Sequence, residues 1–153
     1  AKVYNDFLSL GFDGINSIGK SRAEMIVQGK YKRAFLFKLH EKFSFLPVLK
    51  YNYPEVVKHF FAPEDSWENV FPSIYPNWDR TPRTGDQDGI YINATPENFQ
   101  HHIEHALEVI KDKQPEHSIL FLRSWNEWAE GNYVEPDLKY GHGFLDAIHN
   151  AIL

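Results

Sequence analysis

Two glutamates, Glu127 and Glu130, lie three residues apart in a run that also contains two tryptophans and an asparagine. Carboxylate pairs carry out the proton transfers of glycoside cleavage, and aromatic side chains offer flat faces to sugar rings. Three residues separate two α-carbons by at most about 10 Å, so this spacing suits the carboxyl distances of both retaining and inverting glycosidases. We predict a carbohydrate site with Glu127 and Glu130 as its catalytic pair and substrate contacts from Trp125, Asn126 and Trp128.

A second polar segment, residues 75–83, follows a candidate strand. We predict that four of its side chains also contact substrate, namely Tyr75, Trp78, Asp79 and Arg83. Each segment also has a purely structural interpretation. Residues 125–130 could be a surface turn with two solvated glutamates and two anchoring tryptophans, and residues 75–83 could be a loop bridged by an Asp–Arg ion pair.

The elements that must position these residues alternate between strands and helices. The apolar patterns predict strands at 12–18, 45–51, 70–75 and 118–122, and helices at 4–10, 54–61, 96–113 and 144–152. Residues 19–45 carry little pattern, and the apolar run 118–122 predicts a strand that is buried on both faces. Strand-then-helix units predict the α/β class with a parallel sheet, whose reactive groups gather at the carboxyl ends of the strands.

The helix at 96–113 has the clearest pattern, because Thr95 suits an N-cap and Pro96 suits a first helical turn. It also contains His101, Glu104 and His105, which match the H-x-x-E-H pattern of inverted zinc peptidases. Helical geometry puts both histidines opposite the apolar face, on the solvent side. We therefore predict no metal site here.

Composition narrows the classes of function. The 153 residues carry 16 Lys and Arg against 21 Asp and Glu, a net charge of −5 that argues against nucleic acid as a partner. The absence of cysteine excludes a disulfide framework but does not identify the compartment. No apolar run is long enough to span a membrane, so we expect a soluble protein without a transmembrane segment. A cytoplasmic location in a bacterium is a further expectation. No phosphate-cradling glycine loop is present, and we predict no cofactor. The basic cluster at 30–42 is interpreted as solvated surface, with a phosphate-bearing sugar donor as the alternative.

Several separated motifs resemble one known family. The runs 125–137 and 140–145 resemble the closing signature of WbsX-like polysaccharide-biosynthesis proteins, which are similar to glycoside hydrolase family 99. The loop 76–83 resembles the aromatic-Asp-x-Thr loop of that family, and Gly11-Phe12-Asp13-Gly14 resembles a glycine-led strand start. The resemblance covers nearly the whole chain and is weakest at residues 19–45.

The resemblance implies a (β/α)₈ TIM-barrel fold. Such a barrel typically takes about 250 residues, and only four units are counted here, so we expect residues 1–153 to be the carboxyl-terminal half of one barrel domain. A half barrel exposes strand edges. We therefore expect the chain to associate with itself or with a missing amino-terminal half barrel.

The resemblance also implies a mechanism. Glu127 would be the base that helps the sugar's own 2-hydroxyl attack the anomeric carbon, through an anhydro-sugar intermediate, and Glu130 would be the acid/base that protonates the leaving oxygen. A general acid needs a raised pKa, which exclusion of water by Trp128 could supply. The implied substrate is an α-linked, mannose-like glycan or oligosaccharide in surface polysaccharide or lipopolysaccharide biosynthesis. Ala129 departs from the histidine usual in the mannosidases, so the sugar itself stays open.

Two other functions fit the same residues. One is a non-catalytic glycan-binding module in which Trp78, Trp125 and Trp128 form a stacking platform and the carboxylates only bind hydroxyls. The other is an assembly domain without a site of its own. The glycan-binding module would be indicated if Trp128→Ala abolished glycan binding and no glycan were ever hydrolysed. The assembly domain would be indicated if the chain stayed inactive after the missing half barrel was supplied.

Overall fold

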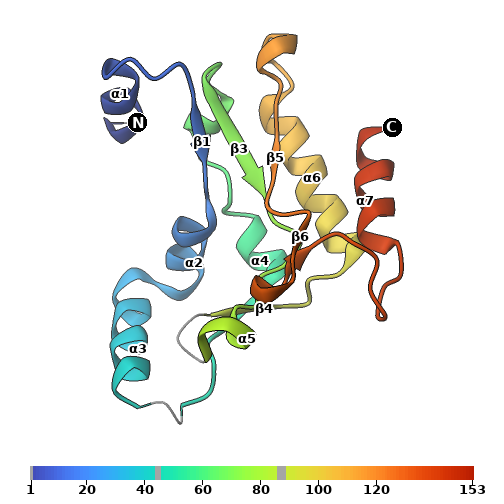
Figure 1. The fold of residues 1–153 in the computed structure, drawn as a ribbon. Coiled ribbons are helices and arrows are strands. Elements are labelled where there is room, and N and C mark those ends of the chain that lie inside the picture. The colour runs from blue at the N-terminus through green and yellow to red at the C-terminus, as the bar shows by residue number, and fades with distance from the viewer. Residues whose placement is uncertain (1, 44–45, 86–88) are drawn as a thin grey trace.

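Three short parallel strands form the main sheet, in the order β1 (Ile15–Ser17), β3 (Val70–Ile74) and β5 (Phe121–Leu122). In this computed structural model, which describes residues 2–43, 46–85 and 89–153, Ile15 lies beside Val70 and Ser73 beside Phe121. Helices fill the connections between the strands (Figure 1). The predicted α/β class with a parallel sheet is confirmed, and the strands of the described residues form an open sheet, not a closed barrel.

Two smaller strand pairs complete the β structure. The strands β2 (Lys50–Asn52) and β4 (Ile90–Ile92) are parallel, and β6 (Asn126–Glu127) and β7 (Asn132–Tyr133) form an antiparallel hairpin. The predicted strand at 45–51 therefore begins later, at Lys50, and it pairs outside the main sheet; residue 45 lies outside the described residues. Its partner β4 was not predicted, because three residues are too few to set up a pattern.

The helices predicted at 4–10, 54–61, 96–113 and 144–152 are present with shifted ends, and the described residues contain three further helices that were not predicted. The helices are α1 (Lys2–Ser9), α2 (Lys20–Gln28), α3 (Lys30–Lys42), α4 (Tyr53–Val57), α5 (Thr81–Thr84), α6 (Pro96–Ile110) and α7 (Gly143–Ile152), with 3₁₀ turns η1 (Pro63–Ser66), η3 (Pro115–His117) and η4 (Trp128–Glu130). Thr95 caps α6 as predicted, since its hydroxyl accepts a bond from the amide of Asn98 at 3.2 Å. The weakly patterned region 19–45 contains α2 and α3, and α3 leaves Tyr31 and Phe35 exposed.

Two apolar clusters hold these elements together. One surrounds α4 and the parallel pair of β2 and β4, and its aromatic members are Tyr51, Tyr53, Phe60, Tyr75, Trp78 and Tyr91. The other lies between β3, α6 and α7, and includes Ile74, Phe99, Ile103, Val134 and Phe144. Helix α6 packs against both α7 and β3, and Figure 1 shows α6 and α7 side by side. The long helix α6 thereby fixes the strand that leads into the predicted site.

The prediction that residues 118–122 are buried on both faces is wrong for this chain. Strand β5 contains only Phe121 and Leu122, and Phe121 is 47% exposed. Because β5 is the end strand of the described sheet, its outer edge and part of its surface have no neighbouring strand.

Two histidines of α6 lie on the solvent side as predicted, and a third is buried. His101 and His105 are exposed, whereas His102 is buried, with its Nδ1 at 3.0 Å from the hydroxyl of Tyr53. Among the described residues there is no group of three or more metal-ligating side chains. In the same part of the chain, none of the helices has the length and apolar character needed to cross a membrane.

Candidate functional site

The two segments predicted to carry chemistry meet at the carboxyl ends of β3 and β5. The loop after β3 reaches the hairpin after β5 through one backbone bond, in which the amide of Asp79 donates to the carbonyl of Glu130 at 2.8 Å. Gly131 follows with φ +61°, and a Cβ at this position would lie only 2.8–3.0 Å from Asp79 atoms. This close approach explains the glycine, which has no side chain to collide with the loop.

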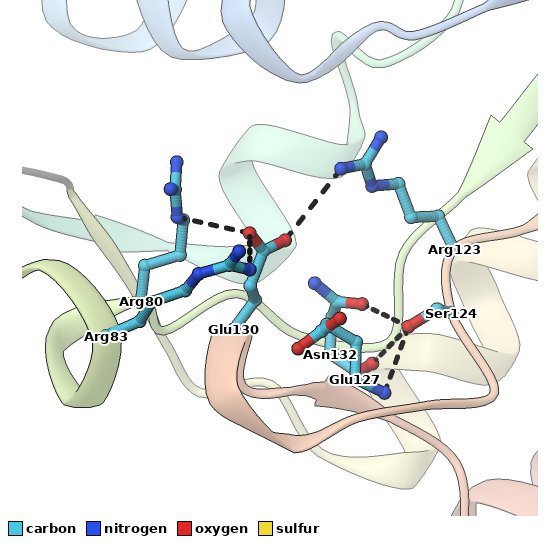
Figure 2. Close-up of polar contacts among 7 residues, drawn as sticks. All are labelled: Arg80, Arg83, Arg123, Ser124, Glu127, Glu130 and Asn132. Atoms are coloured by element: carbon cyan, nitrogen blue, oxygen red, sulfur yellow. Dashed lines mark hydrogen bonds and ion pairs between the residues drawn. The ribbon is translucent and has the colours of Figure 1, made fainter.

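Glu130 lies at the centre of a cluster of arginines (Figure 2). Its side chain is buried, with Oε1 at 3.1 Å from Nη1 of Arg83 and 3.3 Å from Nε of Arg80, and Oε2 at 3.8 Å from Nη2 of Arg123. A buried carboxylate needs such partners, because ion pairs offset the loss of its hydration. The three arginines are therefore the charged partners of Glu130 in the described part of the chain.

The carboxylate of Asp79 forms hydrogen bonds within its own loop. Its Oδ1 accepts bonds from the backbone amide of Thr81 at 3.0 Å and from the hydroxyl of Thr81 at 2.6 Å. In the described ion pairs, Arg80 and Arg83 contact Glu130 and not Asp79. The described ion pairs of this loop therefore do not lie within the loop, as the structural interpretation of residues 75–83 had it. They join Arg80 and Arg83 to Glu130 and so hold the loop against the hairpin.

Glu127 lies on the same hairpin in a different environment. Its amide donates to Oγ of Ser124 at 3.2 Å, and Oγ also lies 2.8 Å from the carbonyl oxygen of Asn132 (Figure 2). These contacts fix the backbone of Glu127, which is paired with Asn132 across the hairpin. Within the described part of the chain its half-buried carboxylate has no hydrogen bond or ion pair, so it is available to a ligand.

The tryptophans of the predicted site have two different environments. Trp125 and Trp128 are 55% and 47% exposed, whereas Trp78 is 5% exposed and belongs to the core. The amine of Lys20 lies 4.2 Å from the centre of the Trp78 ring, a cation–π contact that covers its face. The indole of Trp128 stacks on Tyr133 with ring centres 3.6 Å apart. The open aromatic surface therefore comes from the hairpin and not from Trp78.

Tyr75 and Asn126 complete the predicted set. Tyr75 is buried beside Trp78, and burial raises the pKa of its phenol, an effect opposed by Arg123, whose guanidinium lies 5.9 Å from the ring. Asn126 is exposed at the start of the hairpin. The structure thus brings Tyr75 and Arg83 to the same end of the sheet as the glutamates.

Sequence reasoning missed a buried carboxylate near this site. Glu24, on α2, is 1% exposed and lies 2.8 Å from Nζ of Lys20 and 2.9 Å from Nη2 of Arg33. It also accepts a bond from the hydroxyl of Tyr91 at 3.2 Å, and burial raises the pKa of that phenol well above its usual value. The i, i+4 spacing of Lys20 and Glu24 was the one available signal.

Comparison with known proteins identifies the family of this chain. The family model described as Glycosyltransferase WbsX matches residues 2–148. The uncharacterized protein WxcX of Xanthomonas campestris pv. campestris, in strain B100 and in strain ATCC 33913, is 33% identical over 84 residues. That match covers 54% of this chain but only 12% of WxcX, and no solved structure matches the chain. Because the family model spans almost all of its residues, the chain belongs to the WbsX glycosyltransferase family.

Proposed function

We propose that this domain cleaves or transfers α-linked, mannose-like sugars in the biosynthesis of a surface polysaccharide or lipopolysaccharide, with Glu127 and Glu130 as its catalytic pair. Membership in the WbsX family indicates a carbohydrate-related role in polysaccharide biosynthesis. The observation that carries the finer proposal is the pairing of a buried, arginine-bound Glu130 with an uncommitted Glu127 on one hairpin after β5.

The two carboxylates differ in a way that suits different roles. Glu127 has no described partner, so it can accept the proton of a sugar hydroxyl as that oxygen attacks the anomeric carbon. Glu130 delivers its proton to the leaving oxygen as the anhydro-sugar forms. In the second step Glu130 takes a proton from the attacking water or acceptor hydroxyl, and Glu127 returns its proton to the 2-oxygen as the intermediate opens. Glu130 can give a proton only after its ion pairs with the arginines are broken. Arg83 and Arg123 are about half exposed, so both can move away from Glu130 when a substrate arrives.

We also propose that this domain is part of a (β/α)₈ barrel. Strands β1, β3 and β5 form part of the wall of a (β/α)₈ barrel, with α6 and α7 as outer helices. Support comes from the parallel order of the strands and from the position of the glutamates at their carboxyl ends, where barrel enzymes place their sites. The open edge at β5 then receives a neighbouring strand from a partner half barrel or from a second copy.

The proposal is tested in the protein that carries these residues. Glu130→Gln keeps the size of the side chain but removes its acid/base chemistry, so turnover of α-linked manno-oligosaccharides should fall by about 10²–10⁴-fold. Binding of the same oligosaccharides should persist. Undiminished turnover in this variant would contradict the assignment.

A glycan-binding module without catalysis is the second candidate, and the exposed indoles of Trp125 and Trp128 favour it. Under this alternative Trp128→Ala abolishes binding, and no glycan is hydrolysed or transferred even by the unmodified protein.

A further inference from the structure

A cavity of about 800 Å³ lies beside the hairpin and separate from the two glutamates. Its walls come from β4 and the two residues after it, from Asn77 in the loop after β3, from the hairpin, and from the loop between β7 and α7 together with the start of α7. Its volume falls in the range of about 300–1,000 Å³ typical of ligand sites. Neither Glu127 nor Glu130 lines it, so the function proposed above leaves it without a role.

The chemistry of the walls matches a sugar ring. A pyranose has an apolar face of C–H groups and a rim of hydroxyls, so it needs aromatic surface together with a few polar groups. Aromatic surface comes from Tyr91, Trp128, Tyr133, Tyr140 and Phe144, and polar groups come from Asn77, Asn93, Asp137 and Lys139. The charged residues among those named are one acid and one base, which suits an uncharged sugar.

The aromatic wall is rigid before any ligand arrives. Trp128 and Tyr133 stack at an interplanar angle of 15°, and the indole Nε1 of Trp128 donates to Glu135 at 2.7 Å. The hydroxyl of Tyr133 lies 3.1 Å from Asp137, whose other oxygen accepts bonds from two backbone amides of the same loop. Preorganised walls lower the entropic cost of binding.

The cavity is also adjacent to the catalytic segment. Trp128 stands between Glu127 and Glu130 in the chain, and Gly131, another lining residue, follows Glu130 directly. Resting on the proposed function, we infer that this cavity is a second subsite, which holds a neutral sugar unit of the same oligosaccharide next to the unit that reacts.

The test is titration of the protein that carries these residues, labelled with ¹⁵N at tryptophan, with an α-linked mannobiose. The indole N–H signal of Trp128, assigned by its loss in Trp128→Phe, should shift on titration. Tyr133→Ala should weaken the affinity by at least about tenfold, whereas Tyr133→Phe, which keeps the ring, should bind within about threefold of the unmodified chain. If Tyr133→Ala fails to fold, Asn93→Gly serves instead. Glycine tolerates the positive φ of 61°, and the substitution removes the side-chain amide that lines the cavity and donates to Asn52.

The failure of this inference can be told from the failure of the proposed function. Unchanged affinity in the cavity variants overturns the subsite, even when glutamate variants abolish turnover. Weakened affinity in the cavity variants together with normal turnover in Glu130→Gln supports the subsite and contradicts the catalytic pair. A glucuronic acid-containing disaccharide that binds more tightly than mannobiose would overturn the assignment to a neutral sugar.

Discussion

Arg83 and Glu130 are 47 residues apart in the chain, yet the Nη1 atom of Arg83 lies 3.1 Å from the Oε1 atom of Glu130. The contact joins the loop after β3 to the hairpin after β5. With the backbone bond from Asp79 to Glu130, it holds the two polar segments at one end of the sheet. The position of Glu130 is therefore determined by the loop as much as by its own hairpin.

Removing one arginine tests how much this contact contributes to stability and how much to activity. Arg83 is about half exposed, so Arg83→Gln should lower the free energy of unfolding by no more than about 1 kcal/mol. Turnover should fall further, by about tenfold or more, because Arg83 holds Glu130 in position until a substrate displaces it. Chemical denaturation and steady-state kinetics measure the two effects. A large loss of stability with normal turnover would show that Arg83 is only structural.

The close approach at Gly131 gives a prediction with an internal control. Gly131→Ala meets both an unfavourable positive φ and the nearby Asp79, whereas Gly141→Ala, at φ +56°, meets no atom within 4 Å. Gly141→Ala should cost about 1–2 kcal/mol from the left-handed backbone alone. Gly131→Ala should cost more and should also reduce activity. Equal losses in urea unfolding would mean that the hairpin does not rely on this contact.

The buried ion-pair cluster of α2 gives a stability prediction. Glu24→Gln leaves Lys20 and Arg33 without their carboxylate, so unfolding should become easier by about 3–5 kcal/mol. The matched control is Glu55→Gln, which removes an exposed pair with Lys58 at 2.8 Å and should change stability by less than about 1 kcal/mol. Similar effects of both substitutions would contradict the importance of burial at Glu24.

Because His102 is buried, we expect the free energy of unfolding to depend on pH. Burial lowers the pKa of His102 to about 3, while an unfolded histidine has a pKa near 6.5. Between these values the unfolded chain binds a proton that the folded chain does not, so the free energy of unfolding rises with pH across this window. The contribution of His102 is fully present above about pH 6.5 and decreases as the pH falls toward 3.

The measurement is the slope of stability against pH in the unmodified chain and in His102→Phe. One histidine contributes at most about 1.4 kcal/mol per pH unit, and His102→Phe should remove that part of the slope. Identical slopes would show that His102 takes up its proton in the folded state as easily as in the unfolded one.

The sequence was most informative where local pattern and local chemistry agree. Thr95 and the apolar spacing after it predicted α6, because a cap and an amphipathic face are set by neighbouring residues. The pairing of β2 with β4 and the burial of Glu24 depend on contacts between distant segments, which no local pattern encodes.

The candidate site shows the same division. The two polar segments were predicted at strand ends, and they do meet there, because parallel strands bring their carboxyl ends to one edge. The partners of Glu130 could not be predicted, because three arginines from two loops converge on it only in the folded chain. Trp78 lies in the core beneath Lys20, and its contact with substrate stays a prediction.

The central claim, that Glu127 and Glu130 act together in catalysis, is tested most directly by comparing turnover in Glu127→Gln, Glu130→Gln and the double variant. Residues that act as one unit have non-additive effects. Each single variant should lose about 10²–10⁴-fold in kcat, and the double variant should lose little more. The exposed Glu116→Gln serves as the control and should retain full activity. Normal turnover in either single variant would contradict the claim.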